Sequence, residues 1–143
     1  MCGRTPVSLA ILACIAACTV GCRGEKGAKI TGVVVENGQP VQISAKERVM
    51  LSMVPVHKDE KSIKANPGAD FKREDATFIF VGPGLGLLPP GDYKVCLTVW
   101  SRDTPDRYNG QFSPENTPLT YAVTHESKQE IVIDVEKKSV TRK

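Results

Sequence analysis

The sequence has little cysteine outside its N-terminal segment, and this scarcity excludes two kinds of small domain. Of five cysteines in 143 residues, four lie at or before Cys22 and the fifth is Cys96. A disulfide-stapled domain needs cysteines spread over its folded region, because each bridge closes a loop. Structural zinc takes four Cys or His ligands, whereas Cys14 and Cys18 stand in an apolar run. The domain must therefore be held together by an ordinary hydrophobic core.

A strong excess of one charge is also missing. The formal net charge is +3, and charged residues make up 24% of the chain. A nucleic-acid-binding domain needs a clustered basic face, so nucleic acid is not an expected partner. The basic residues of 138–143 are predicted to form a solvated C-terminal tail, because chain ends fray unless other contacts hold them.

Catalytic groupings are scarce as well. The two histidines, His57 and His125, both adjoin charged loop residues, and no Gly-x-Ser-x-Gly motif is present. A metal site from His57, Asp59 and Glu60 would lack both the four ligands of structural zinc and a calcium-binding loop. The sequence therefore predicts no catalytic residue, no metal and no cofactor, and we expect that the protein is not an enzyme.

What the chain does have is one apolar segment at its N-terminus, MCGRTPVSLAILACIAACTVGC. Arg4 supplies a positive charge, and the uncharged run from Thr5 to Cys22 follows it. A transmembrane helix needs about 20 apolar residues, and this run is short for one and contains Pro6. The layout is typical of a cleaved secretory signal, which we place at residues 1–21.

The end of this segment resembles the bacterial lipobox, a short apolar or small triplet before a cysteine. In that family the cysteine is acylated and the bond before it is cut, so the resemblance implies lipidation of Cys22, with Cys18 as the alternative. Residues 22–28 would then form the lipidated cysteine and a flexible tether with two glycines. Arg23 is not the aspartate that retains enteric lipoproteins in the inner membrane, which favours the outer membrane.

After Lys29 the pattern changes to short apolar runs separated by turn residues, over a domain that we place at residues 29–137. No segment has a sustained helical period, and Asn-Gly at 37–38 predicts a hairpin turn. The spacing predicts a single antiparallel β-sandwich of an all-β class. The expected strands cover 29–36, 48–56, 77–82, 92–100, 119–125 and 128–136, with charged or turn-rich loops at 57–70 and 101–118.

The stretches ITGVVVENGQPV and TFIFVGPGLGLLPPGDYKVCLTV resemble carboxypeptidase-regulatory-like, transthyretin-like β-sandwich modules. RYNGQFSPENTPLTYAVTHESKQEIVIDV resembles the closing hairpin of small lipoproteins common in planctomycete-type bacteria. The turn Pro90-Gly91-Asp92-Tyr93 is the most specific part. The family would place a glycine in the turn before Phe78, where this chain has Glu74-Asp75-Ala76-Thr77. The resemblance implies a transthyretin-like or Ig-like sandwich in a lipid-anchored protein.

These features together predict a noncatalytic module of the cell envelope, held to a membrane by its lipid and binding or scaffolding proteins or glycans. The alternatives are a small-ligand carrier, or a small envelope hydrolase that uses His57 or His125. Trp100 and Tyr108 are the candidate ligand contacts: Trp100 directly precedes the long loop at 101–118, and Tyr108 lies within it. Cys96 is expected to be a buried structural residue.

Overall fold

The computed structural model describes residues 27–57, 66–82 and 86–143. The signal peptide and both candidate lipidation sites, Cys18 and Cys22, lie outside these ranges. The described residues include no helix that is long and apolar enough to cross a membrane. They form strands, turns and irregular segments, and the strands are β1 Lys29–Glu36, β2 Gln39–Pro40, β3 Arg48–Pro55, β4 Gly68–Lys72, β5 Thr77–Val81, β6 Gly91–Trp100, β7 Thr120–Val123, β8 Lys128–Asp134 and β9 Ser139–Arg142.

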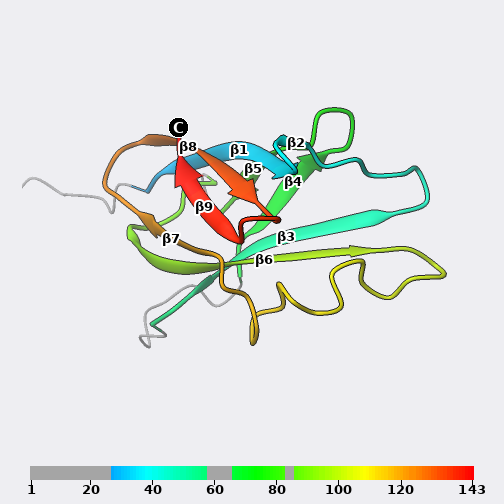
Figure 1. The fold of residues 1–143 in the computed structure, drawn as a ribbon. Coiled ribbons are helices and arrows are strands. Elements are labelled where there is room, and N and C mark those ends of the chain that lie inside the picture. The colour runs from blue at the N-terminus through cyan, green and yellow to red at the C-terminus, as the bar shows by residue number, and fades with distance from the viewer. Residues whose placement is uncertain (1–26, 58–65, 83–85) are drawn as a thin grey trace, which may run out of the picture.

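The strands form one curled sheet in the order β7-β6-β3-β4-β5-β1-β8-β9, and β2 adds to the end of β1. The sheet bends sharply between β3 and β4, which share only the pair Ser52 and Gly68. Its two ends, β7 and β9, come into contact, so the sheet is nearly closed (Figure 1). One layer holds β4, β5, β1, β8 and β9, and the other holds β3, β6 and β7. The predicted all-β sandwich is thereby confirmed.

The core lies between the two layers and is built by alternation along each strand. In β6, Tyr93, Val95, Leu97 and Val99 are all buried, as their alternation predicts. Other large, fully buried side chains come from both layers and from the segments before and after β6: Ile30, Leu51, Met53, Phe80, Leu88, Phe112, Leu119, Ile131 and Ile133.

Strand β1 lies in the middle of the larger layer, and a glycine lets it pack closely there. Gly32 lies beside Ile131 of β8 and Phe78 of β5. A Cβ atom at this position would meet the Phe78 ring at 2.7 Å. Past β1, Asn37 and Gly38 both have positive φ, 52° and 75°, which is the geometry of a type I′ hairpin turn. The hairpin turn predicted from Asn-Gly is confirmed.

The Pro90-Gly91-Asp92-Tyr93 motif turns the chain into β6. Gly91 has a φ of 153°, which residues with a side chain rarely adopt. Tyr93 buries its ring, and its hydroxyl donates a hydrogen bond of 2.9 Å to the carbonyl of Pro89. This residue therefore closes the turn that precedes it. Before Phe78, where a glycine was expected, Ala76 itself takes the left-handed conformation, with a φ of 54°.

The long segment after β6 is not an independent loop, because it covers one edge of that strand. Leu97 N–H donates to the carbonyl of Phe112 at 3.1 Å, and Val95 N–H donates to that of Leu119 at 2.9 Å. Between them, the buried hydroxyl of Thr117 donates to the Val95 carbonyl at 2.7 Å. These bonds satisfy backbone groups that a missing neighbouring strand would leave unpaired.

Two pairing expectations were wrong. The strands of 119–125 and 128–136 do not form a hairpin: β7 pairs with β6, and β8 crosses to the other layer. There, β8 runs parallel to β1 over seven residue pairs from Lys29 to Val35, so the sandwich is not purely antiparallel. The physical reason is that β1 has an open edge in the other layer, and the apolar face of β8 is buried only there.

Two segments expected to be loop or tail are strands. Gly68–Lys72 forms β4, because the aromatic strand β5 has an open edge and cross-strand pairing overrides weak strand propensity. Ser139–Arg142, placed in the basic tail, forms β9 on β8. Its Val140 packs against the core, and Lys143 pairs with Glu130 at 2.8 Å. Arg142 likewise pairs with Glu126, so these two C-terminal charges are neutralised along the sheet edge.

Replacing Lys138 by glycine is expected to stabilise the protein. Lys138 is exposed in the β8–β9 turn, with a φ of 51°. A left-handed residue with a side chain costs roughly 1 kcal/mol, and glycine relieves this cost. Thermal unfolding should show a melting temperature several degrees higher for Lys138→Gly. The control is Glu136→Gly in the same turn, which has no positive φ and should lower it; equal shifts in both variants would contradict the explanation.

Candidate anion-binding site

A small pocket opens at one end of the β3–β6 pair, where β3 begins and β6 ends. Its volume is about 320 Å³. Its lining is three basic side chains, one indole and one serine, from Lys46, Arg48, Trp100, Ser101 and Arg102. Arg48 is the direct cross-strand partner of Trp100, and such partners place their side chains on the same face. We call this the basic pocket.

Arg102 belongs to the pocket because β6 ends in a tight turn at Ser101. Ser101 N–H donates to the carbonyl of Thr104 at 2.8 Å. The Ser101 hydroxyl oxygen accepts the N–H groups of Thr104 at 3.1 Å and of Asp103 at 3.3 Å. A serine side chain that caps its own turn in this way holds the following residues in one conformation. The turn therefore fixes the position of Arg102 relative to Trp100.

The other side of the pocket is held by an ion pair between Glu47 and Arg107. Arg107 Nη2 lies 2.6 Å from Glu47 Oε2, and its Nε donates to Oε1 at 3.1 Å. The same Nη2 donates to the carbonyl of Gln42 at 3.0 Å. Hydrogen bonds from Arg107, and then from Ser44 N–H, hold the pKa of Glu47 below its ordinary value. The pair ties the segment before β3 to the segment after β6.

Two of the three acidic side chains near the basic pocket are engaged elsewhere. Glu47 faces Arg107, and the Asp106 carboxylate accepts three backbone N–H groups at 2.6 to 3.3 Å. Asp103 is exposed. Within the residues that the structure describes, none of the three pocket cations forms an ion pair. The pocket therefore presents three positive charges to an incoming ligand, around one flat apolar ring.

The two aromatic candidate residues, Trp100 and Tyr108, have different surroundings in the structure. Trp100 lines the basic pocket and is half-buried. Tyr108 does not line it: its ring packs edge-on against Phe112 at 5.2 Å, and its hydroxyl is buried without a hydrogen-bond partner. Lys46, Arg48 and Arg102 were not predicted as site residues. Only their clustering in the fold distinguishes them, because each looks like an ordinary surface charge in the sequence.

The other residues considered from sequence are not gathered into a site. His57 and His125 are exposed in separate loops, and Asp59 and Glu60 lie outside the described residues. Among the residues described, no three His, Cys, Asp or Glu side chains are grouped to hold a metal. Cys96 is buried and unbridged, and desolvation raises the pKa of its thiol. It has the structural character that was predicted for it.

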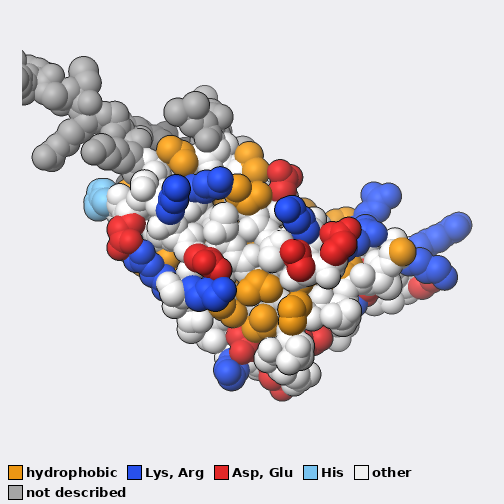
Figure 2. All heavy atoms as spheres, turned by 90° about the horizontal axis from the view of Figure 1, so that it is seen from above, with side chains coloured by type: hydrophobic (Ala, Val, Ile, Leu, Met, Phe, Trp, Pro, Cys, Tyr) orange, Lys and Arg blue, Asp and Glu red, His pale blue; other side chains and the backbone are white. Residues whose placement is uncertain are grey.

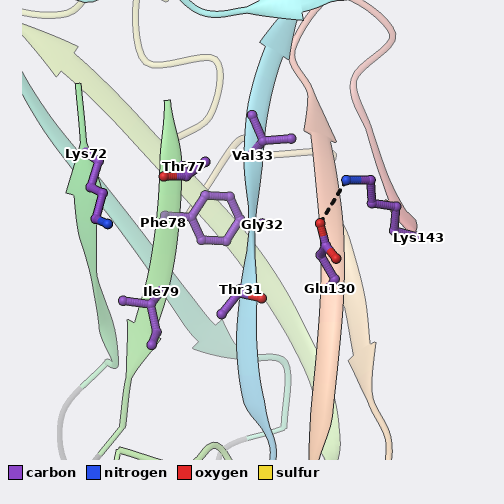
Figure 3. Close-up of a pocket in the computed structure, with 9 residues that line it drawn as sticks. All are labelled: Thr31, Gly32, Val33, Lys72, Thr77, Phe78, Ile79, Glu130 and Lys143. Atoms are coloured by element: carbon purple, nitrogen blue, oxygen red, sulfur yellow. Dashed lines mark hydrogen bonds and ion pairs between the residues drawn. The ribbon is translucent and has the colours of Figure 1, made fainter. Parts of the chain in front are cut away.

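A second, wider hollow of about 570 Å³ lies on the outer face of the other layer. Its floor carries short side chains of Thr31, Val33, Thr77 and Ile79 (Figure 3). At one side, Lys143 donates to Glu130 at 2.8 Å, so these two charges neutralise each other. Figure 2 shows acidic, basic and hydrophobic side chains interspersed over the visible face. This hollow therefore lacks the one-sided charge of the basic pocket.

Comparisons with known proteins identify a distant structural neighbour. No family model and no curated protein matches the chain. Among solved structures, the chain is similar to a DUF3823 family protein from Parabacteroides merdae, with 19% identity and a TM-score of 0.44. The similarity covers 83% of this chain and 48% of that one, so the chain spans about half of its neighbour's length. The lipoprotein and transthyretin-like assignments stay predictions.

The Glu47–Arg107 pair should stabilise the protein in a pH-dependent way. Because the pKa of Glu47 is lowered in the folded state, its contribution is full above the ordinary value of 4.5 and is lost as the pH falls through the lowered value. Glu47→Gln should cost about 1–2 kcal/mol at neutral pH. Melting temperatures from pH 7 to pH 3 should show the gap to the native protein closing.

The matched control for this prediction is Glu74→Gln. Glu74 is exposed, and within the described residues it forms no ion pair, so this variant should differ little from the native protein at any pH. A gap between Glu47→Gln and the native protein that stays constant down to pH 3 would show that the charge of Glu47 does not act as described.

Proposed function

We propose that this chain is a noncatalytic, lipid-anchored module of the bacterial cell envelope that binds acidic polysaccharide in the basic pocket. The observation that supports this ligand is the set of three cations around one indole, with no acidic side chain in the lining. Guanidinium groups form paired hydrogen bonds with carboxylate or sulfate, and a lysine ammonium adds a point charge. The indole offers a flat apolar surface to the C–H face of a sugar ring.

The placement of the pocket suits a tethered protein. In Figure 1, β1 begins at one end of the sandwich, whereas β3 begins and β6 ends at the opposite end. The basic pocket lies at this second end. A chain anchored through its N-terminus would therefore hold the pocket away from its own membrane. This geometry favours a ligand in the surrounding envelope over the lipid headgroups next to the anchor.

Binding can be measured directly, because Trp100 is the one tryptophan in the chain. Addition of polygalacturonate or dextran sulfate should change its fluorescence, and neutral dextran should not. Lys46→Ala should weaken binding by at least about tenfold, since hydrogen bonds between charged groups contribute about 1.5–3 kcal/mol each. Lys72→Ala is the matched control, because it removes an exposed lysine from the other layer.

The same titration distinguishes carboxylated from sulfated polysaccharide by comparing the two polymers. It also tests against nucleic acid, which likewise stacks on aromatic rings and pairs with cations. Tighter binding of a single-stranded oligonucleotide than of either polysaccharide would contradict the proposed ligand. Equal weakening by Lys46→Ala and Lys72→Ala would show that binding follows overall charge and not the pocket.

The lipid anchor is tested separately by the mass of the mature protein. We expect a mature N-terminus at Cys22 that carries acyl chains, because two or more chains are needed for stable attachment. Cys22→Ala should move the protein from the membrane fraction to the soluble fraction, and Cys18→Ala should leave it in place. The reverse pattern would assign the lipid to Cys18, and membrane retention of both variants would contradict a lipid anchor.

A further inference from the structure

We propose that the bound polysaccharide continues out of the basic pocket along the outer face of β3 and β6, so that the ligand is an extended chain and not a single sugar. This inference rests on the proposed function, because it takes an acidic polysaccharide in the pocket as its starting point. The residues that would carry the chain are the pairs Arg48–Trp100 and Met50–Thr98 and, at the far end, Ser52, whose partner Cys96 is itself buried. We call this row the β3–β6 track.

The strand register defines the direction and length of the track. Alternation places Arg48, Met50 and Ser52 on the face of β3 that points away from the core, since Leu51 and Met53 are buried. The partners of these three residues on β6 lie on the same face. Ser52 lies four residue steps along the extended strand β3 from Arg48, or about 13 Å. A straight surface of this length is longer than one sugar ring.

Met50 is the strongest single indication that a ligand binds along the track. Its side chain is 55% exposed, the largest exposure among the large hydrophobic residues that the structure describes. It stands one cross-strand pair away from Arg48 and Trp100. Met50 therefore extends, beyond the pocket, the pocket's own combination of cationic and apolar side chains. Met50 can adapt its shape to a sugar ring, because its side chain is unbranched and flexible.

The charge along the track suits a polyanion. None of the five side chains of the track is acidic, and Arg48 is basic. The track ends at Ser52, beside the buried Cys96, where the charges of Lys94 and Glu115 act on the thiol in opposite directions and desolvation is the main cause of its raised pKa. The outer face of the other layer differs, because it carries Glu130 in an ion pair with Lys143. The β3–β6 track therefore continues from the basic pocket without an acidic side chain of its own.

The experiment introduces a negative charge at the far end of the track. Ser52→Glu lies about 13 Å from Arg48 along β3, beyond the screening length of about 8 Å at physiological salt. It should therefore leave binding of digalacturonate in the pocket unchanged. Polygalacturonate, which would pass over position 52, should bind about fivefold more weakly, as expected for like charges about 4 Å apart in water. Affinities are read from Trp100 fluorescence at constant salt.

Two controls separate charge from size and position. Ser52→Gln has about the volume of Ser52→Glu without its charge. For each ligand, the effect of the charge is therefore the affinity of Ser52→Glu divided by that of Ser52→Gln. Thr31→Glu places the same charge on the outer face of the other layer and should change neither affinity. Met50→Ala should weaken polygalacturonate more than digalacturonate. Melting temperatures confirm that all variants are folded.

The outcomes distinguish the two proposals. Selective weakening of polygalacturonate by Ser52→Glu supports the track. An unchanged affinity for both ligands, or equal weakening of both, overturns the track and leaves the basic pocket as the whole site. If neither ligand binds the native protein, or if Lys46→Ala binds both as well as the native protein does, the proposed function itself fails.

Discussion

The second edge of β6 is the constraint from which the rest of the site follows. β6 is the longest strand, and β3 pairs with one edge over eight residues, whereas β7 covers only the beginning of the other. The remaining backbone groups are buried and need partners, because each unpaired group would cost about 1–3 kcal/mol. The segment after Trp100 supplies them by returning along β6. Its path brings Arg107 to Glu47 and so determines where the basic pocket forms.

The ion pair of Glu47 with Arg107 then decides the charge of the pocket. Glu47 stands between Lys46 and Arg48 and would neutralise one of them if it faced the same way. Arg107 draws the carboxylate to the other side, and Ser44 N–H fixes it there. The two neighbouring cations are left to face Trp100 across the strand pair. One interaction thus stabilises the junction of two segments and also leaves a local excess of positive charge.

Local sequence patterns predicted several strands directly. They missed the strands that form only because a neighbouring strand has an open edge. β1 follows from its β-branched, valine-rich composition, β6 from its period-two pattern, and the Asn37-Gly38 turn from its dipeptide. β4 and β9 depend on the open edges of β5 and β8, which only the folded chain reveals. The basic pocket was missed for a related reason. Trp100 stood out as the one tryptophan. The cations beside it lie at the start of β3 and after the end of β6, and they become neighbours only because these two strands pair, which no local sequence pattern shows.

The ends and outer faces of the sandwich are better suited to ligand binding than its core is. Inside, apolar side chains fill the space between the layers, so chemistry is confined to strand ends and outer faces. At the end where β1 begins, an N-terminal anchor would leave little free surface. At the opposite end, β3 and β6 place their outward side chains beside two tight turns that add charge. A ligand can reach that end without any change in the layers, so the site can vary in sequence while the sandwich stays the same.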